Sequence, residues 1–313
     1  MATPNLSEII TTTLRNRSKS LADNVTNHNA LLRRLSENGN ISTVTGRQIV
    51  RELEYASNGT VGFYSGYETL DVSPSDVLTS ATFDYKQMAG NVTISGLEQI
   101  QNSGTEAVIN LLESRIGVLE KTMSNTLSTS LYSDGTGTSG KEVGGLQLIV
   151  ADAGTGTVGG INSSTYTFWQ NAQTTATSSA FSTTNIQADM NTIYLSLVRG
   201  ADSPDLIMAD TNAYKSFLGS LQAIQRVTSD RVATSGFTSV QYLNSDVIFD
   251  DACPTNKMYF LNTDYLRLEV AANRNFVPGE AKMSVNQDAM VTPMFWSGNL
   301  TCSNRALQGV IHV

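Results

Sequence analysis

The sequence predicts an α+β protein, in which one long helix and one compact mixed unit are joined by extended segments. Three observations support this class. Apolar residues keep a helical period for about 35 residues after position 97. A stretch rich in Thr, Val, Tyr and Phe precedes them, and helix and strand patterns alternate from about residue 186 onwards.

The composition is that of a folded chain that uses few charges. Hydrophobic residues make up 40% of the 313 residues and charged residues 15%, so neutral polar groups carry much of the surface. Cys253 and Cys302 are too few for a disulfide framework or a zinc site, and we expect two free thiols. No apolar run approaches the roughly 20 residues that cross a bilayer, and the N-terminal residues lack the basic-then-apolar order of a signal peptide. We therefore expect no membrane partner, and we expect no metal or cofactor.

The N-terminal segment is basic, unlike the rest of the chain. Residues 1–51 hold seven basic and three acidic residues, which is +4 in a chain of net charge −8 and leaves −12 elsewhere. Apolar residues from Leu6 to Leu35, spaced by threes, fours and sevens, predict one or two amphipathic helices. We expect a further short helix around Arg47 to Tyr55.

The next two elements are a hairpin and a long helix. Strand-like residues from Val61 to Ser95 predict an extended two-stranded hairpin that returns through Ala89-Gly90-Asn91. The helical period from Leu97 to Leu131 corresponds to roughly 50 Å of helix at 1.5 Å per residue. A helix of that length is expected to act as a spine for other elements.

The second half contains the compact unit. Residues 133–184 are rich in Gly, Ser and Thr and predict loops. Helices are expected at 186–198 and 212–225, with strands at 205–209, 239–242, 247–249, 258–261 and 265–270. The last segment, 289–313, predicts paired strands.

Two glycine-rich stretches imitate nucleotide-binding motifs. GTGTSGK, Gly135 to Lys141, matches the spacing of a phosphate-binding loop, but Glu142 stands where a Ser or Thr should bind magnesium, and a helix rather than a strand precedes the loop. A nucleotide-binding α/β enzyme that uses the Gly135–Lys141 loop is kept as the alternative function. GTGTVG, Gly154 to Gly159, lacks a following helix and a following acidic residue, which indicates a surface turn.

The remaining candidates for catalysis are few. His28 and His312 have no partner at a recognisable spacing, so we predict no catalytic residue. Asp250 and Asp251 precede Cys253 at the end of an apolar strand, and we interpret them as turn residues of a hairpin between strands 247–249 and 258–261.

Several longer phrases carry a resemblance to a known family. They are GLEQIQNSGTEAVINLLESR with SLYSDGTG (97–137), GGINSSTYTFW (159–169), DVIFDDACPTNKMYFLNTDYL (246–266), NRNFVP (273–278) and NQDAMVTPMFWSGNLTCSNRALQGV (286–310). With the order of elements, they make the sequence resemble the major capsid proteins of tailed double-stranded DNA bacteriophages, which have the Hong Kong 97-type fold. The resemblance covers the chain from about residue 60 to its end.

The resemblance implies a division of the chain and a function. It implies an N-terminal arm (1–58), an extended hairpin loop (59–96), a peripheral domain with the spine helix (97–184), an axial α/β domain (185–279) and a return to the peripheral domain (280–313). The implied function is structural and not enzymatic. Homo-pentamers and homo-hexamers would form the icosahedral head of a phage or prophage, assembled in the bacterial host cytoplasm and located in the virion.

The resemblance also implies partners and contact residues. The partners would be a portal protein, a separate scaffolding protein, a decoration protein and packaged double-stranded DNA, bound without sequence specificity. Lys86 is the only lysine between Lys19 and Lys121, and it lacks a recognisable asparagine and glutamate pair, so we expect no covalent crosslink between subunits. The expected subunit contacts are Phe63, Tyr64, Phe83, Tyr85 and Lys86. The expected basic residues of an inner face are Arg15, Arg17, Lys19, Arg33 and Arg34.

Overall fold

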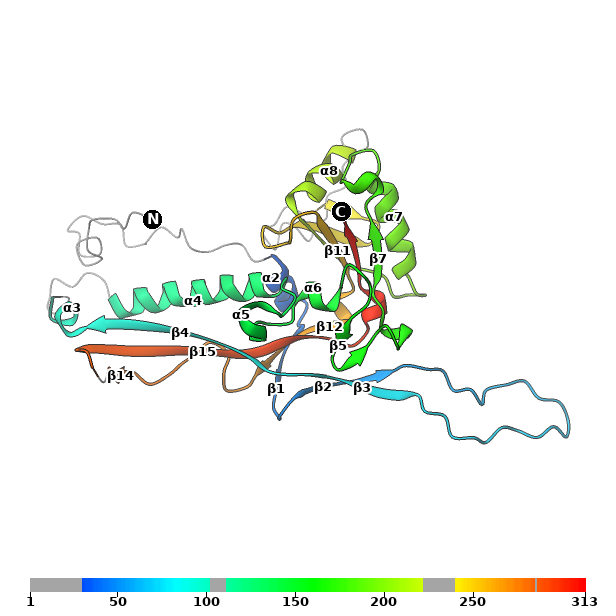
Figure 1. The fold of residues 1–313 in the computed structure, drawn as a ribbon, viewed down its shortest axis with the longest axis horizontal. Coiled ribbons are helices and arrows are strands. Elements are labelled where there is room, and N and C mark those ends of the chain that lie inside the picture. The colour runs from blue at the N-terminus through cyan, green and yellow to red at the C-terminus, as the bar shows by residue number, and fades with distance from the viewer. Residues whose placement is uncertain (1–29, 102–110, 222–239, 285) are drawn as a thin grey trace.

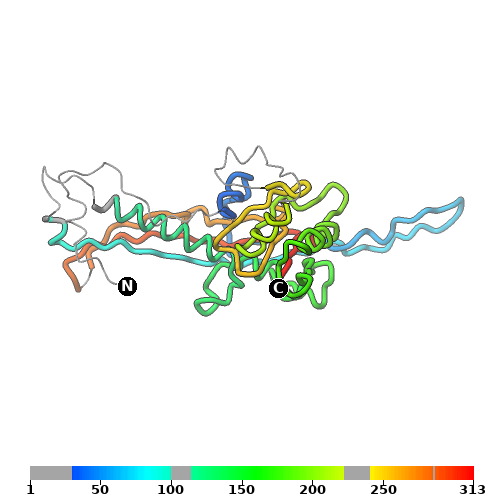
Figure 2. Tube along the Cα trace, turned by 90° about the horizontal axis from the view of Figure 1, so that it is seen from above, coloured from blue at the N-terminus to red at the C-terminus, as the bar shows by residue number. Residues whose placement is uncertain are grey.

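The computed structural model describes residues 30–101, 111–221, 240–284 and 286–313, and it shows an elongated molecule (Figures 1 and 2). A long sheet and its covering helix extend to one side of a compact α/β unit, and a narrow hairpin extends to the other side. The predicted amphipathic helices between residues 6 and 29 lie outside the described residues. The described part of the arm begins with α2 (Ala30–Glu37).

The long sheet is built around one strand of 14 residues, β15 (Ala289–Cys302). On one side β15 pairs antiparallel with β12 (Leu266–Ala271), which pairs parallel with β1 (Ile41–Val44). Along its other part it pairs with β4 (Lys86–Ser95), β13 (Val277–Pro278) and β14 (Lys282–Met283). The last segment does form two paired strands, as predicted, but β15 and β16 (Gly309–His312) find their partners in different sheets and do not pair with each other.

The spine lies on this sheet. Helix α4 (Leu111–Ser130) runs along β4, and α3 (Gly96–Gln101) follows directly after β4 (Figure 1). Met123, Leu127 and Leu131 are buried at helical spacing, as the periodicity predicted. Residues 102–110 lie outside the described part of the chain, so the predicted continuity of one helix from Leu97 onwards stays a prediction.

The α/β unit has a second sheet of six strands. Its order is β7 (Ala172–Thr175), β16 (Gly309–His312), β11 (Lys257–Leu261), β8 (Leu206–Ala209), β10 (Ser245–Phe249) and β9 (Val240–Tyr242). Helices α7 (Ile186–Leu197) and α8 (Thr211–Leu221) pack against it. All four residues of the inner strand β8, LIMA, are buried, which suits a strand that is covered on both faces.

Short elements connect the two sheets. They are α5 (Gly137–Gly140), α6 (Leu146–Ile149), β5 (Thr157–Val158), β6 (Ile161–Asn162) and the 3-10 turns η1 (Thr167–Trp169), η2 (Thr177–Ser179), η3 (Thr263–Tyr265) and η4 (Arg305–Leu307). The larger hydrophobic core joins α2, α4, the connecting segment and the long sheet, whereas a second core fills the α/β unit.

The predicted helix at Arg47 to Tyr55 is wrong, because this segment is the strand β2 (Ile49–Glu54). It pairs antiparallel with β3 (Leu78–Phe83), so that Ile49 lies opposite Phe83. Ile49 and Leu53 are both buried, and a spacing of four residues fits one face of a helix as well as one face of a strand. The strand was selected by pairing with β3, whose residues are 24 to 34 positions away in the sequence.

The predicted turn at Ala89-Gly90-Asn91 is also wrong. Strand β4 continues through these residues and pairs with β15 over its whole length, from Lys86 opposite Gly298 to Ser95 opposite Ala289. Gly90 has a packing role instead, because a Cβ there would collide with the side chain of Leu119 in α4. The hairpin is therefore formed by β2 and β3, and its tip lies between residues 55 and 77.

Strands β10 and β11 do not form the predicted hairpin, because β8 lies between them in the sheet. Strand β10 is parallel to β8, and β11 is antiparallel to it. Asp250 and Asp251 therefore begin a connection that passes over the end of β8.

Candidate functional site

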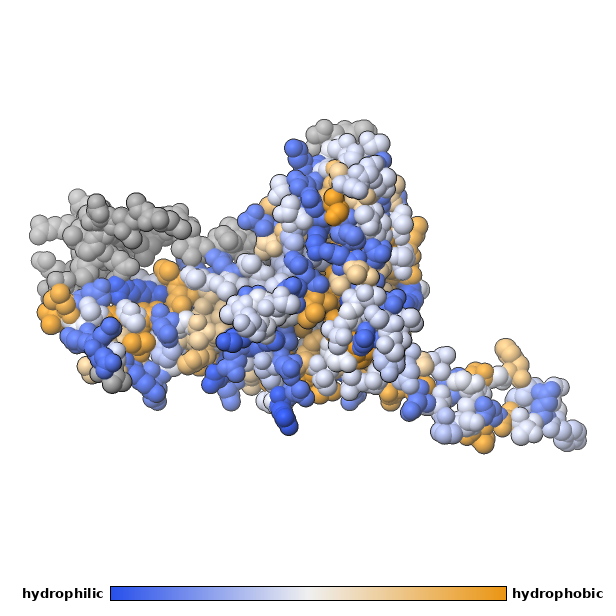
Figure 3. Space-filling view, viewed as in Figure 1, coloured by the Kyte–Doolittle hydropathy of each residue, from blue (hydrophilic) through white to orange (hydrophobic). Residues whose placement is uncertain are grey.

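The projecting loop, residues 55–77, is the most unusual surface of the molecule. It continues the β2–β3 hairpin away from the body, and almost all of its residues are exposed (Figures 1 and 2). Figure 3 shows hydrophobic residues along it. Its exposed large hydrophobic residues are Tyr55, Val61, Phe63, Tyr64, Tyr67, Leu70 and Val72. Contiguous exposed apolar side chains of this size are typical of a surface that another protein covers.

The loop is also acidic. Glu68, Asp71 and Asp76 are its only charged residues, and the chain has no basic residue between Arg51 and Lys86. The surface that covers the loop should therefore combine apolar groups with basic groups. Sequence reasoning singled out Phe63 and Tyr64 but missed these three acids, although the one-sided charge of the segment is visible in the sequence.

The root of the loop is anchored to the body by an ion pair. Ile49, Arg51 and Leu53 share the inward face of β2. The Arg51 guanidinium pairs with the carboxylate of Glu269 in β12, which is 1% exposed. Burial and the nearby Arg267 lower the pKa of Arg51. The root of the hairpin is therefore fixed to the body, whereas the loop beyond it makes few contacts with the rest of the chain.

The other predicted contact residues are placed differently from Phe63 and Tyr64. Phe83 is buried in its own subunit, with 5% of its surface exposed, which argues against a contact role. Tyr85 is half-buried against the larger core. The Lys86 ammonium donates a hydrogen bond of 2.6 Å to the carbonyl of Gly140. Only the first two of the five predicted residues belong to the projecting loop.

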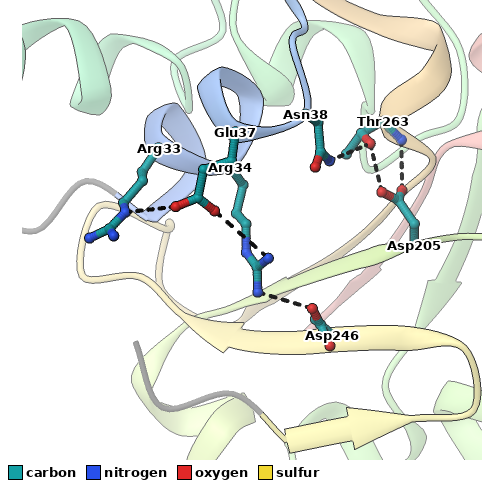
Figure 4. A network of polar contacts seen from close by, with 7 residues as sticks. All are labelled: Arg33, Arg34, Glu37, Asn38, Asp205, Asp246 and Thr263. Atoms are coloured by element: carbon teal, nitrogen blue, oxygen red, sulfur yellow. Dashed lines mark hydrogen bonds and ion pairs between the residues drawn. The ribbon is translucent and has the colours of Figure 1, made fainter. Parts of the chain in front are cut away.

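Helix α2 joins the arm to the α/β unit through polar contacts (Figure 4). Arg34 is buried and pairs with Asp246 at 3.0 Å, while Arg33 pairs with Glu37 at 2.9 Å. The next turn is held by Thr263, which accepts a hydrogen bond from Asn38 and donates to Asp205. These contacts use Arg33 and Arg34 within their own subunit.

Arg15, Arg17 and Lys19 lie outside the described residues. Of the five predicted inner-face residues, the structure therefore places only Arg33 and Arg34, and both neutralise carboxylates of the same chain.

Asp250 has a structural role, as predicted for a turn, and it joins three segments. Its carboxylate accepts hydrogen bonds from Ala252 N, Leu31 N and the Tyr132 hydroxyl, at 3.0, 3.3 and 2.9 Å. Burial raises the pKa of this carboxyl. Cys253, three residues on, is a buried free thiol whose pKa is raised by burial. The arrangement holds the start of α2 against the end of the spine and does not activate a nucleophile.

The Gly135–Lys141 loop is unsuited to phosphate. It follows the C-terminal end of α4, and within it Thr138, Ser139 and Gly140 have positive φ. The carboxylate of Glu142 lies over Gly137 and accepts a hydrogen bond from Thr138. A negative group therefore occupies the place where a phosphate would be held, and nothing in the structure supports the alternative nucleotide-binding function.

No group of His, Cys, Asp or Glu within the described residues is arranged to hold a metal ion. Within the same residues, no helix combines the length and the hydropathy that crossing a bilayer requires.

Comparison with known proteins identifies the fold. No protein-family profile matches the sequence, and no curated protein matches it. A capsid protein from the asymmetric unit of cyanophage A-1(L) matches 96% of this chain and 96% of its own, with a TM-score of 0.72 and 17% identity. A capsid protein of a native GTA particle matches 100% and 99%, with a TM-score of 0.67 and 8% identity. An encapsulin from Synechococcus elongatus PCC 7942, solved as the holo-SrpI complex, matches 98% and 95%, with a TM-score of 0.64 and 10% identity.

These matches extend over nearly the whole of each chain. The chain therefore has the fold of phage capsid proteins, and this confirms the α+β, Hong Kong 97-type fold that the sequence phrases indicated.

Proposed function

We propose that this chain is the major capsid protein of a tailed double-stranded DNA bacteriophage or prophage. The observation that carries the proposal is the agreement of the entire fold with a cyanophage capsid protein, at a TM-score of 0.72 over 96% of both chains. The projecting loop supports it independently, because its exposed apolar residues require a covering partner.

The proposed mechanism is association rather than catalysis. Many copies form homo-pentamers and homo-hexamers, and the projecting loop of one subunit lies over a neighbour. The low charge density of the chain, 15% charged residues, limits the cost of removing water from large contacts. Phe63 and Tyr64 are the proposed anchors, since both are highly exposed in the single subunit.

The division of the chain into arm (1–58), hairpin loop (59–96), peripheral domain (97–184 and 280–313) and axial domain (185–279) stays a prediction. A portal protein, a separate scaffolding protein and a decoration protein remain proposed partners, and assembly in the host cytoplasm remains the proposed location.

Contact with packaged DNA is proposed for Arg15, Arg17 and Lys19 alone. Arg33 and Arg34 are left out, because their partners Glu37 and Asp246 already compensate their charge. Attraction of basic side chains to DNA phosphates is independent of sequence and weakens with salt.

Electron microscopy of the full chain, expressed alone and together with its neighbouring genes, tests the proposal. We expect closed shells of uniform size, and particles from the natural host should contain nuclease-protected double-stranded DNA. A subunit that stays small in light scattering under all conditions contradicts shell formation. Shells from the host that contain no DNA contradict the phage assignment, and a small particle that nucleotide stabilises would support the alternative enzyme.

A further inference from the structure

One segment of the body supports the root of the hairpin and bears on the direction in which the projecting loop points. This segment, residues 157–169, contains β5, the turn Gly159-Gly160, β6 and η1, and we name it the bracket. In Figure 1 it lies beside β3, where the hairpin leaves the body.

Gly159 is the point of closest contact between bracket and hairpin. The Thr82 amide of β3 donates a hydrogen bond of 2.9 Å to the Gly159 carbonyl, so the bracket caps the free edge of β3. A Cβ on Gly159 would stand 2.7 Å from the Cβ of Ala81 and 3.2 Å from the ring of Phe83. The hairpin can therefore pack this closely against the bracket only because Gly159 has no side chain.

An aromatic contact supports the other strand of the hairpin. The ring of Tyr55, one residue after β2, lies 5.5 Å from the ring of Phe168 between centroids. Phe168 in turn lies 6.2 Å from Trp169, whose indole N–H donates to the carbonyl of Val158 at 3.1 Å. The two halves of the bracket are tied together by this bond. Tyr55 is thus the first residue of the projecting loop, and its ring still contacts the body.

Arg305 holds the bracket from behind. This side chain is fully buried, and no ion-pair partner for it is present among the described residues. Its guanidinium donates to the Ser163 hydroxyl at 2.9 Å, the Trp169 carbonyl at 3.2 Å and the Asn171 side chain at 2.9 Å, and its Nε donates to the carbonyl of Ile149. Burial lowers the pKa of Arg305 to about 10. A buried guanidinium that donates both to the bracket, at Ser163 and Trp169, and to the segments on either side of it, at Ile149 and Asn171, fixes the bracket against the body.

We propose that the bracket, locked by Arg305, sets the direction in which the hairpin projects, and thereby determines which surface of a second subunit the loop reaches. The effect on a second subunit rests on the proposed shell function, whereas the contact between the bracket and the hairpin is a property of the single chain. Roughly 11 residues separate Tyr55 from the tip, which at about 3.3 Å per residue is a lever of roughly 35 Å. A small rotation at the root therefore becomes a displacement of several ångströms at the tip.

Two adjacent glycines provide a matched test. Gly159 and Gly160 have φ of +59° and +79°, so alanine is strained at both positions. Only Gly159→Ala also collides with Ala81 and Phe83, whereas the nearest atom to a Cβ at Gly160 is the Thr82 hydroxyl at 3.5 Å. Spin labels on Ser65→Cys in the loop and Thr192→Cys in α7 report the direction of the hairpin, because both native cysteines are buried.

We expect the distance distribution between the labels, measured in the full unassembled chain, to shift in Gly159→Ala and to match the unsubstituted protein in Gly160→Ala. The Gly159→Ala chain should also form fewer or misshapen shells. An unchanged distribution in Gly159→Ala overturns the inference. If that variant does not fold, Tyr55→Ala decides in its place, and a broader distribution supports the bracket whereas an unchanged one refutes it. The label distances are independent of assembly, so a failure of the proposed shell function is recognised separately, by an unsubstituted chain that forms no shells.

Discussion

The projecting loop and the α/β unit use hydrophobic residues in opposite ways. In the α/β unit, Phe217, Met258, Phe260 and Ile311 are fully buried between one sheet and two helices. In the loop, Phe63, Tyr67 and Val72 are 90% exposed or more. The unit is therefore complete within one chain, whereas the loop exposes apolar side chains that we propose a second subunit covers. Subunit stability and assembly should respond to different substitutions.

Removal of the loop should have the largest effect on assembly. Residues 56–76 are replaced by Asn-Gly, so that Tyr55 and Val77, which already share a hydrogen bond of 3.0 Å, are joined by a two-residue turn. We expect a soluble, folded subunit that forms no shells. The loop that is proposed to contact the neighbouring subunit is gone, while the β2–β3 pairing remains. Thermal unfolding and electron microscopy measure the two properties.

A second variant separates the reach of the loop from its chemistry. It keeps the length and replaces Val61, Phe63, Tyr64, Tyr67 and Leu70 by serine. It should also fail to assemble, and normal shells from either variant would show that the loop is not an assembly surface.

A matched pair of phenylalanine substitutions contrasts the two regions directly. Phe260→Ala should lower the free energy of unfolding by about 3–5 kcal/mol, because it removes a fully buried ring and leaves a cavity. Phe63→Ala should change this free energy by less than about 0.5 kcal/mol, because the ring is exposed in the subunit, yet it should weaken assembly. Urea denaturation of the subunit and light scattering of the shells give the two readings. A similar loss of stability in both variants would erase the distinction between the regions.

Arg305→Met should destabilise the subunit by about 3 kcal/mol, since the buried acceptors of Ser163, Trp169 and Asn171 lose their donor. Arg33→Met is the control, because Arg33 forms an exposed ion pair with Glu37 and should cost less than about 1 kcal/mol. Denaturant unfolding of both variants measures the difference. Equal costs would mean that Arg305 contributes no more than a surface residue.

The smallest expected effect concerns pH. Glu98 lies in the first turn of α3 and pairs with Arg115 at 2.9 Å, and hydrogen bonds from Arg115 and Ser95 lower the pKa of its carboxyl to about 2. Because the pKa is lower in the folded chain, the pair stabilises above the ordinary pKa near 4.5 and loses this contribution as pH falls towards 2. Both side chains are partly exposed, so we expect less than about 1 kcal/mol.

A double-mutant cycle of Glu98→Gln and Arg115→Gln measures this contribution. The coupling free energy should be favourable at pH 7 and should vanish near pH 2. A coupling that is independent of pH would contradict the assigned ion pair.

Elements whose residue pattern allows one interpretation could be predicted from the sequence alone. The helical period around Met123, Leu127 and Leu131 was sufficient to predict the spine, and the apolar run at Leu206 to Ala209 was sufficient to predict a strand. In both cases the spacing of apolar residues within one short stretch is enough to distinguish a helix from a strand. The quoted phrases indicated the fold, and two cysteines indicated the free thiols.

Features that depend on contacts between distant segments could not be predicted in this way and became visible in the folded chain. Ile49 and Leu53 became strand residues because β3 lies beside them, and Gly90 became a packing residue because α4 crosses it. Phe83, expected on the surface, is buried beneath Gly159, and Arg34 is neutralised by Asp246, which is 212 residues away. In each case the local sequence fits more than one environment, and the free energy of a long-range contact selects among them.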